Sequence, residues 1–465
     1  MHDGPVSTGT GLFDHPTAQG APEDAERRRF TPPVGPIDAW RDGDLWRATG
    51  IRYARAERWG VPEPEPDHTQ PLAATRWAAA PPQTTDATGE SLYSPLRRDL
   101  DVDEHCQRLS ILAPADVADD EALPVVVWIH GGSYIFGTGD SSITDPDDLV
   151  REQRVVAVTV TYRLGALGYI GTDSRPANLG LLDQAQALRW VRRNIAAFGG
   201  DPENVTAIGE SAGADAIVHL LAAFPDEPLV DRAILQSPPL GIRRRRERMA
   251  RATARVVAAL DESSAYEDIL AIEKPVTATA LRYGLVGSMP FGIEYGREPM
   301  PPEDEVEAAW AQVAPRVPII ITTMGTEFSF FSRQVGLIER AGRAAGFDRR
   351  VLEPLEGWFS RAIFTRAIDE FARDWAAAGG DARRGEITWS APGNAFRSPH
   401  GLDVLLQFGS REVWEGSALL RGSRWEDFVH AGQVLRAAWG AFARGEDPGQ
   451  GEEGILSLRA VDAAE

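Results

Sequence analysis

The stretch Gly209-Glu210-Ser211-Ala212-Gly213 lies between two apolar segments of the chain. The segment before it, 205–208, predicts a buried strand, and the segment after it, 214–221, predicts a helix. A strand, a sharp turn and a helix in this order are typical of a nucleophile elbow, in which a strained turn exposes the serine side chain. The alternative is an ordinary Gly/Ser turn that caps a helix. The first interpretation makes Ser211 a candidate nucleophile, placed where helix N–H groups can face a developing negative charge.

A second motif lies upstream, where the apolar run 125–129 leads directly into His130-Gly131-Gly132-Ser133-Tyr134. A glycine-rich loop in this position is where elbow hydrolases build their oxyanion hole, because small residues let backbone N–H groups approach the substrate oxygen. A plain strand-end turn is the alternative. A phosphate-binding P-loop is excluded, because it requires a Gly-Lys pair and Lys274 is the only lysine of the chain.

Together the two motifs resemble those of the type B carboxylesterase family, which includes bacterial para-nitrobenzyl esterases and the cholinesterases. Similar segments continue along the chain at 50–54, 58–59, 81–83, 104–111, 161–168, 178–184, 190–202 and 438–448. The resemblance implies an α/β protein with the α/β-hydrolase fold, that is, a doubly wound and mostly parallel central sheet with helical insertions. It also implies a serine esterase that acts on a small-molecule ester and needs no cofactor and no metal.

A serine nucleophile needs a general base, and in this fold the chain order is nucleophile, acid, histidine. Three histidines follow Ser211. His219 lies on the helix of the elbow, too close in sequence to reach back to the serine. His430 lies in a helix-like segment and is expected to face solvent or a neighbouring helix. His400 lies in a loop after a late strand, before Gly401, and the resemblance also favours it as the base.

The acid that orients the histidine is sought at the end of another strand. The apolar run 318–323 predicts that strand, and Glu327 follows it at the position where the family has its glutamate. The alternative is a solvated loop carboxylate. The surrounding residues depart from the family motif, because Thr322, Met324, Thr326 and Phe328 replace Gly, Asn, Asp and Gly. These replacements are expected to change the geometry of the loop around Glu327 more than the role of Glu327 itself.

The resemblance also assigns the oxyanion hole to the backbone N–H groups of Gly132, Ser133 and Ala212. Position 133 is usually Gly or Ala in the family, so the hydroxyl of Ser133 could crowd the site or form a hydrogen bond in it. Glu210 precedes the nucleophile as in the family, and we expect a structural role for it rather than a catalytic one.

The composition limits the remaining functions. A net charge of −21 argues against nucleic-acid binding. No apolar run approaches the ~18 residues that a membrane-spanning helix needs, and the first 40 residues lack the apolar core of a signal peptide. Cys106 is the only cysteine, which excludes an intrachain disulfide and a cysteine-rich zinc site. These features predict a protein of a reducing compartment, the cytoplasm.

Residues 1–35 are expected to form a flexible N-terminal extension, and residues 36–465 a single catalytic domain with helix-rich insertions at about 240–315 and 335–382. Strands are expected at 109–113, 124–130, 155–161, 205–209, 232–236, 317–323 and 385–390. Five aromatic residues either line a substrate pocket or pack in the core, namely Phe291, Tyr295, Phe328, Phe330 and Phe331. The four arginines at 243–246 cannot share one face of a helix, so they are expected to be solvated, with a binding patch as the alternative.

The sequence therefore predicts a serine carboxylesterase for small or medium carboxylic esters, with Ser211, His400 and Glu327 as its triad. A related hydrolase of carbamates, thioesters or lipids is the first alternative. A non-catalytic binding protein on the same fold is the second, although such proteins typically lose the serine or the histidine.

Overall fold

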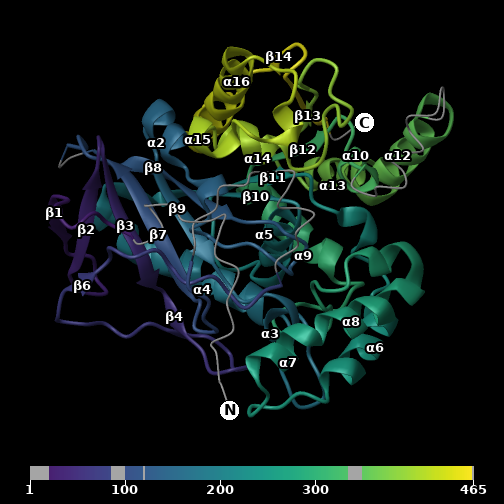
Figure 1. Ribbon diagram of the computed structural model, residues 1–465, viewed down its shortest axis with the longest axis horizontal. Helices are drawn as coiled ribbons and strands as arrows, with labels where there is room; N and C mark the ends of the chain where they lie inside the picture. Colours follow the sequence, from purple (N-terminus) through teal and green to yellow (C-terminus); the bar gives the residue numbers. More distant parts are fainter. Residues whose placement is uncertain (1–19, 85–99, 119–120, 334–347, 463–465) are drawn as a thin grey trace, which may run out of the picture.

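The computed structural model describes residues 20–84, 100–118, 121–333 and 348–462. Within them one large mixed sheet crosses the molecule, with helices on both of its faces (Figure 1). Its strands in chain order are β1 Arg27–Phe30, β2 Ile37–Asp42, β3 Leu45–Arg52, β6 Leu72–Ala73, β7 Arg108–Pro114, β8 Leu123–Ile129, β9 Val156–Thr161, β10 Gly200–Glu210, β11 Arg232–Gln236, β12 Ile319–Met324, β13 Ala382–Ile387, β14 Gly451–Glu452 and β15 Leu456–Ala460. A separate two-stranded ribbon pairs β4 Ala54–Arg55 with β5 Glu63–Pro64.

The strands are ordered β1-β2-β3-β7-β9-β8-β10-β11-β12-β13-β15-β14 across the sheet, and β6 pairs with β2. From β9 to β13 every neighbouring pair is parallel, whereas the pairs from β1 to β9 along this order and from β13 to β14 are antiparallel. Parallel strands covered on both faces are rich in β-branched residues, and β8, β9 and β12 fit that pattern. The expected α/β-hydrolase architecture is confirmed.

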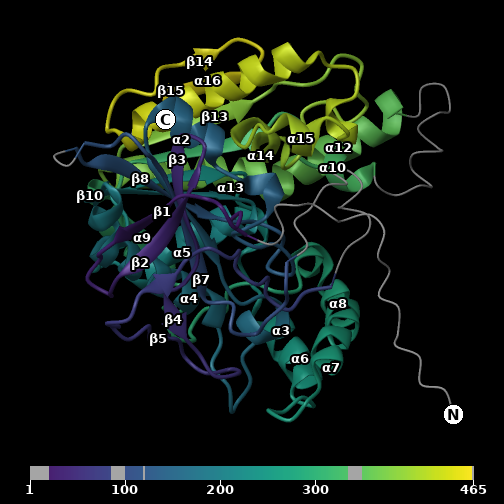
Figure 2. The same cartoon turned by 60° about the vertical axis from the view of Figure 1, so that its left-hand side comes forward.

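The helices lie on both faces of the sheet and beyond its edge (Figures 1 and 2). They are α2 Asp147–Gln153, α3 Gly165–Gly168, α4 Leu179–Asn194, α5 Ala212–Ala223, α6 Glu247–Val257, α7 Tyr266–Ala271, α8 Glu273–Ala280, α9 Val306–Val313, α10 Ser329–Ser332, α12 Glu353–Ser360, α13 Arg366–Ala377, α14 Leu402–Gln407, α15 Arg411–Trp414 and α16 Trp425–Ala443. Two further short helical turns are η4 Leu240–Ile242 and η8 Arg361–Thr365.

Two hydrophobic cores occupy the two faces of the sheet. Val125 and Val127 of β8 point into the core that contains α4, α5 and α13, whereas Val126 and Trp128 point into the core under α14 and α16. This division follows from the two-residue period of a strand, which sends successive side chains to opposite faces. The C-terminal ends of the parallel strands are thereby held rigidly between two helical layers.

Two expectations from the sequence are corrected. The predicted extension runs through residue 35, but residues 27–30 form β1 and pair with β2, because Phe30 is buried and stacks on Phe198 at 4.8 Å; residues 1–19 lie outside the described part. The arginine run precedes α6, and Arg246 is buried rather than solvated. Its guanidinium donates to the carbonyl oxygens of Met289 and Phe291 at 2.8 and 2.9 Å.

Candidate active site

The turn at Ser211 joins β10 to α5 as the elbow motif predicts. Ser211 has φ of 53° and ψ of −120°, a strained conformation for a residue with a side chain. Close packing under the turn demands glycine at its end, because a Cβ on Gly213 would lie 2.0 Å from the carbonyl oxygen of Ile129. The backbone N–H of Ser211 donates to Gln236 on the neighbouring strand at 2.8 Å. The sequence thus fixes the serine at the C-terminal edge of the sheet.

The glycine-rich loop after β8 adopts three consecutive positive φ values, at Gly132 (105°), Ser133 (53°) and Tyr134 (62°). Only glycine fits position 132, because a Cβ there would lie 2.1 Å from the carbonyl oxygen of Phe136. Within the described residues, the N–H groups of Gly132, Ser133 and Ala212 have no hydrogen-bond acceptor. Three donors without a partner beside the serine of the elbow are what an oxyanion requires.

Glu327 and His400 are in direct contact although 73 positions separate them in the chain. His400 Nδ1 lies 2.6 Å from Glu327 Oε2, and the His400 backbone N–H donates to the carbonyl oxygen of Glu327. The other carboxylate oxygen of Glu327 accepts from the Ser237 hydroxyl at 2.6 Å and from the Met324 N–H at 2.7 Å. Glu327 is fully buried. These donors fix the carboxylate, which in turn fixes the orientation of the imidazole.

Glu210 makes the second acidic contact of His400. Its Oε1 lies 3.1 Å from His400 Nε2, at ion-pair distance but without hydrogen-bond geometry. Burial opposes a charge on the imidazole, but the nearby carboxylates of Glu210 and Glu327 outweigh it and raise the pKa of His400 to about 9. Burial raises the pKa of the Glu210 carboxyl to about 8, against the attraction of His400. The structural role expected for Glu210 therefore includes an electrostatic one.

Three other histidines of the described residues, His219, His430 and His130, do not contact Glu327. His219 is buried, with Nδ1 2.6 Å from the carbonyl oxygen of Asp215 and Nε2 2.7 Å from the Tyr295 hydroxyl. His430 is more than half exposed on α16, and its Nε2 contacts Glu452 at 2.9 Å. Burial lowers the pKa of His130 to about 4. Of the three histidines that follow Ser211, His400 contacts Glu327, as the sequence argument requires.

Aromatic rings border the histidine. Phe331 and Phe364 lie 5.4 and 5.0 Å from the His400 ring, centroid to centroid, and Phe330 lies 6.5 Å away. Phe331 is 39% exposed, so one face of this aromatic group is accessible. Of the other aromatic candidates, Phe291 is fully buried in the core and Tyr295 packs against it, whereas Phe328 stacks on Phe359.

Sequence reasoning missed three residues at the site. Ser237 directly follows β11, and a polar residue at the end of a parallel strand was the signal that could have found it. Asp403 is fully buried and accepts from Gln236 at 3.1 Å; burial and then the Glu327 charge raise its carboxyl pKa to about 7. Phe364 gave no signal in the sequence, because its helix approaches His400 only in the folded chain.

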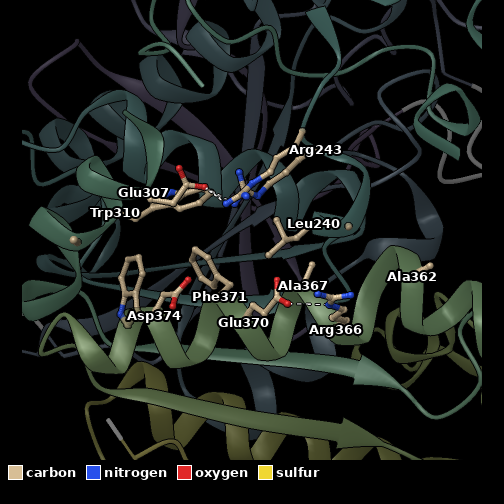
Figure 3. Close-up of a pocket in the computed structure, with 14 residues that line it drawn as sticks. Leu240, Arg243, Glu307, Trp310, Ala362, Arg366, Ala367, Glu370, Phe371 and Asp374 are labelled. Carbon is tan, nitrogen blue, oxygen red and sulfur yellow. Dashed lines mark hydrogen bonds and ion pairs between the residues drawn. The ribbon is translucent and has the colours of Figure 1, made fainter. Parts of the chain in front are cut away.

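A separate cavity of about 350 Å³ lies between η4, α9 and α13. Figure 3 shows Arg243 paired with Glu307 on one wall, opposite Phe371 and the ion pair of Arg366 with Glu370 on the other. As far as the described residues go, its lining includes none of the three expected triad residues. Among all the residues that the structure describes, there is no cluster of His, Cys, Asp or Glu suited to a metal ion. None of the helices that these residues form could span a bilayer.

A sequence model of the Carboxylesterase family matches residues 47–351. The chain belongs to this family. The carboxylesterase is 32% identical over 436 residues to a probable N-octanoylanthranilate hydrolase of Rhodococcus erythropolis, covering 88% of the chain and 95% of that relative. It is 27% identical to a phenmedipham hydrolase of Pseudarthrobacter oxydans, with 89% of each chain covered.

Among solved structures, the carboxylesterase is similar to a thermophilic PNB esterase with a TM-score of 0.77 and 26% sequence identity, over 94% of each chain. The resemblance to type B carboxylesterases and the fold that it implied are thereby confirmed, and the protein is a hydrolase of this family.

Proposed function

We propose that this hydrolase is a serine carboxylesterase that cleaves small to medium carboxylic esters through an acyl-enzyme on Ser211. The contact of His400 Nδ1 with Glu327 at 2.6 Å, beside the strained elbow of Ser211, is the observation that carries the proposal. With Nδ1 engaged by the carboxylate, Nε2 is the nitrogen left to exchange protons with the serine and the leaving group.

In the proposed reaction, Ser211 Oγ attacks the ester carbonyl carbon while its proton passes to His400 Nε2. The N–H groups of Gly132, Ser133 and Ala212 stabilise the oxyanion that forms. When the tetrahedral intermediate collapses, the alkoxide leaves with the proton from His400. Water then attacks the acyl carbon and gives a proton to His400. When the second tetrahedral intermediate collapses, the bond from the acyl carbon to Ser211 Oγ breaks, His400 returns the proton to Oγ, and the carboxylic acid and the free serine are released.

The test is hydrolysis of a series of p-nitrophenyl esters from acetate to dodecanoate. We expect turnover that is greatest for the short and medium chains. No hydrolysis of any ester by folded protein would contradict the proposal and favour a non-catalytic binding protein. The chain retains the serine, the glutamate and the histidine, which such proteins typically do not.

A hydrolase of aromatic amides or carbamates is the second candidate. The exposed ring of Phe331, which lies beside His400, favours it, because this ring would pack against an aromatic substrate. The names of the two curated relatives are consistent with it. Measuring kcat/KM for phenyl acetate, acetanilide and a phenyl carbamate side by side would rank the two candidates.

Two further proposals concern the extent of the catalytic domain and the location of the protein. The catalytic domain expected at residues 36–465 is proposed to be a single unit that also includes β1, because β1 pairs with β2 in the same sheet and the expected site residues come from loops along most of that length. A cytoplasmic location is proposed because the single cysteine, Cys106, is buried and forms no disulfide.

A further inference from the structure

Glu356 of α12 is a buried carboxylate outside the expected triad. Its side chain is 2% exposed. One of its oxygens accepts from the Ser332 hydroxyl at 2.6 Å and lies 3.1 Å from Arg333 Nε, and the other accepts from Arg397 at 2.7 Å. A buried charge is costly unless it is paired and hydrogen-bonded, and Glu356 meets both conditions. Three side chains are therefore tied to one buried carboxylate.

The partners of Glu356 belong to the two loops that carry the expected acid and base. Ser332 ends α10, five residues after Glu327, and Arg397 lies three residues before His400. Helices α10 and α12 lie side by side in both views (Figures 1 and 2). A second contact from α12 reaches the acid loop directly, because the N–H of Phe328 donates to the Ser360 hydroxyl at 3.0 Å. One helix thus binds both loops.

The backbone of Arg397 needs such support. Its φ of 59° lies in the left-handed region, which is strained for a residue with a Cβ. Strained conformations persist only where the surroundings enforce them. The guanidinium of Arg397 is anchored by Glu356 at the start of the loop that ends in His400.

Direct hydrogen bonds join the two loops to each other. The N–H of Thr326 donates to the carbonyl oxygen of Ser398 at 2.9 Å, and the N–H of Ser398 donates to the Thr326 hydroxyl at 3.0 Å. The Ser329 hydroxyl donates to the carbonyl oxygen of Phe396 at 2.7 Å. The loops at 326–333 and 396–400 are therefore joined directly, and α12 forms hydrogen bonds with both of them.

We infer that Glu356 is a positioning residue for the pair of Glu327 and His400, acting through Arg397 and Ser332. The expected effect on kcat rests on the proposed esterase function. The expected effect on the hydrogen exchange of residues 396–400 rests on the geometry alone. Glu356 touches neither substrate nor reacting atoms, so its effect is on the placement of the base. A misplacement of about 1 Å in such a site lowers the rate roughly 100-fold.

The test compares Glu356→Gln with the wild type in p-nitrophenyl ester hydrolysis and in hydrogen exchange of residues 396–400. The amide can still accept from Ser332 but no longer forms an ion pair with Arg397 or Arg333. We expect kcat to fall about 10- to 100-fold with little change in KM, and exchange of the 396–400 amides to accelerate. Glu104→Gln is the matched control, because it breaks a half-buried pair with Arg58 that does not contact the site.

Arg397→Gly keeps the test decisive if Glu356→Gln does not fold. Glycine adopts positive φ freely, so this change removes the anchor without adding strain. We expect the same loss of kcat and the same faster exchange, and little further loss in the double variant. Glu104→Gln should keep the kcat and the amide exchange rates of the wild type. If Glu356→Gln or Arg397→Gly folds and also keeps both, the inference is wrong. An inactive wild type would overturn the proposed function, while the exchange data would still decide the role of Glu356.

Discussion

His400 Nε2 lies 3.1 Å from Oε1 of Glu210, the residue directly before Ser211 in the chain. The imidazole is therefore flanked by carboxylates on both nitrogens, with Glu327 at Nδ1. Both carboxylates are buried, and their attraction for the charged imidazole raises the pKa of His400 to about 9 despite the cost of burying its charge. Glu210 and Glu327 together thus raise the pH at which the candidate base becomes neutral.

The pH dependence of kcat/KM tests this relationship. A general base must be neutral in the free enzyme, so activity is lost as pH falls through its pKa. With that pKa raised to about 9, kcat/KM should still rise between pH 7 and pH 9. Glu210→Gln removes a negative charge and should shift this acid limb to lower pH. Glu203→Gln, on the exposed start of the same strand, should leave it in place. Identical limbs in all three proteins would show that Glu210 does not act on His400.

Substitution of the histidines separates the two candidates for the base. His400→Gln removes the imidazole that Glu327 orients, and we expect turnover to fall by about 10⁴-fold or more. His430→Gln breaks only an exposed contact with Glu452, and kcat should be nearly unchanged. Glu327→Gln should lower kcat severely while the protein remains folded. An active His400→Gln with an inactive His430→Gln would contradict the assignment of both His400 and Glu327.

The glycine-rich loop gives a paired prediction. Gly132→Ala places a Cβ against the carbonyl oxygen of Phe136 and disfavours the φ of 105°, so the loop must move. Loss of one oxyanion donor costs about 3–4 kcal/mol of transition-state stabilisation, which is roughly 10²–10³ in kcat. Ser133→Ala keeps the N–H group and should retain activity. A folded but inactive Ser133→Ala would assign a catalytic role to its hydroxyl.

The ion pair of Arg163 with Asp183 predicts a large effect on stability. Both side chains are buried, and two guanidinium nitrogens contact the carboxylate at 2.7 and 2.8 Å. Asp183→Asn leaves the arginine charge unpaired, so the free energy of unfolding should fall by about 3–5 kcal/mol in urea titrations. Asp67→Asn breaks the exposed pair with Arg193 and should have little effect. Equal stability of Asp183→Asn and wild type would refute the energetic role of the buried pair.

Much of the fold was predictable because the central strands are buried on both faces. Such strands are continuous apolar runs, and β11 coincides with its predicted range of 232–236. The contact between Glu327 and His400 followed from the rule that ligand-binding side chains gather at the C-terminal ends of parallel strands. The elbow of Ser211 followed from its flanking strand and helix.

The remaining features depend on segments that meet only in the folded chain. Nothing near Glu356 in the sequence indicates that it binds Arg397, and Phe364 reaches His400 from an insertion. The arginine run was misjudged for a related reason. Adjacent charges predict exposure, but the carbonyl oxygens that satisfy Arg246 come from residues about forty positions later.

Labelling with a fluorophosphonate tests the central claim most directly, because this reagent reacts with activated serine nucleophiles. Intact mass spectrometry should find one phosphonyl group per chain, and peptide mapping should place it on Ser211. Ser211→Ala should be unlabelled and natively folded, with kcat lowered by about 10⁴–10⁶-fold. A label on a residue other than Ser211 would contradict the account. So would protein that hydrolyses esters but takes up no label when treated with the fluorophosphonate.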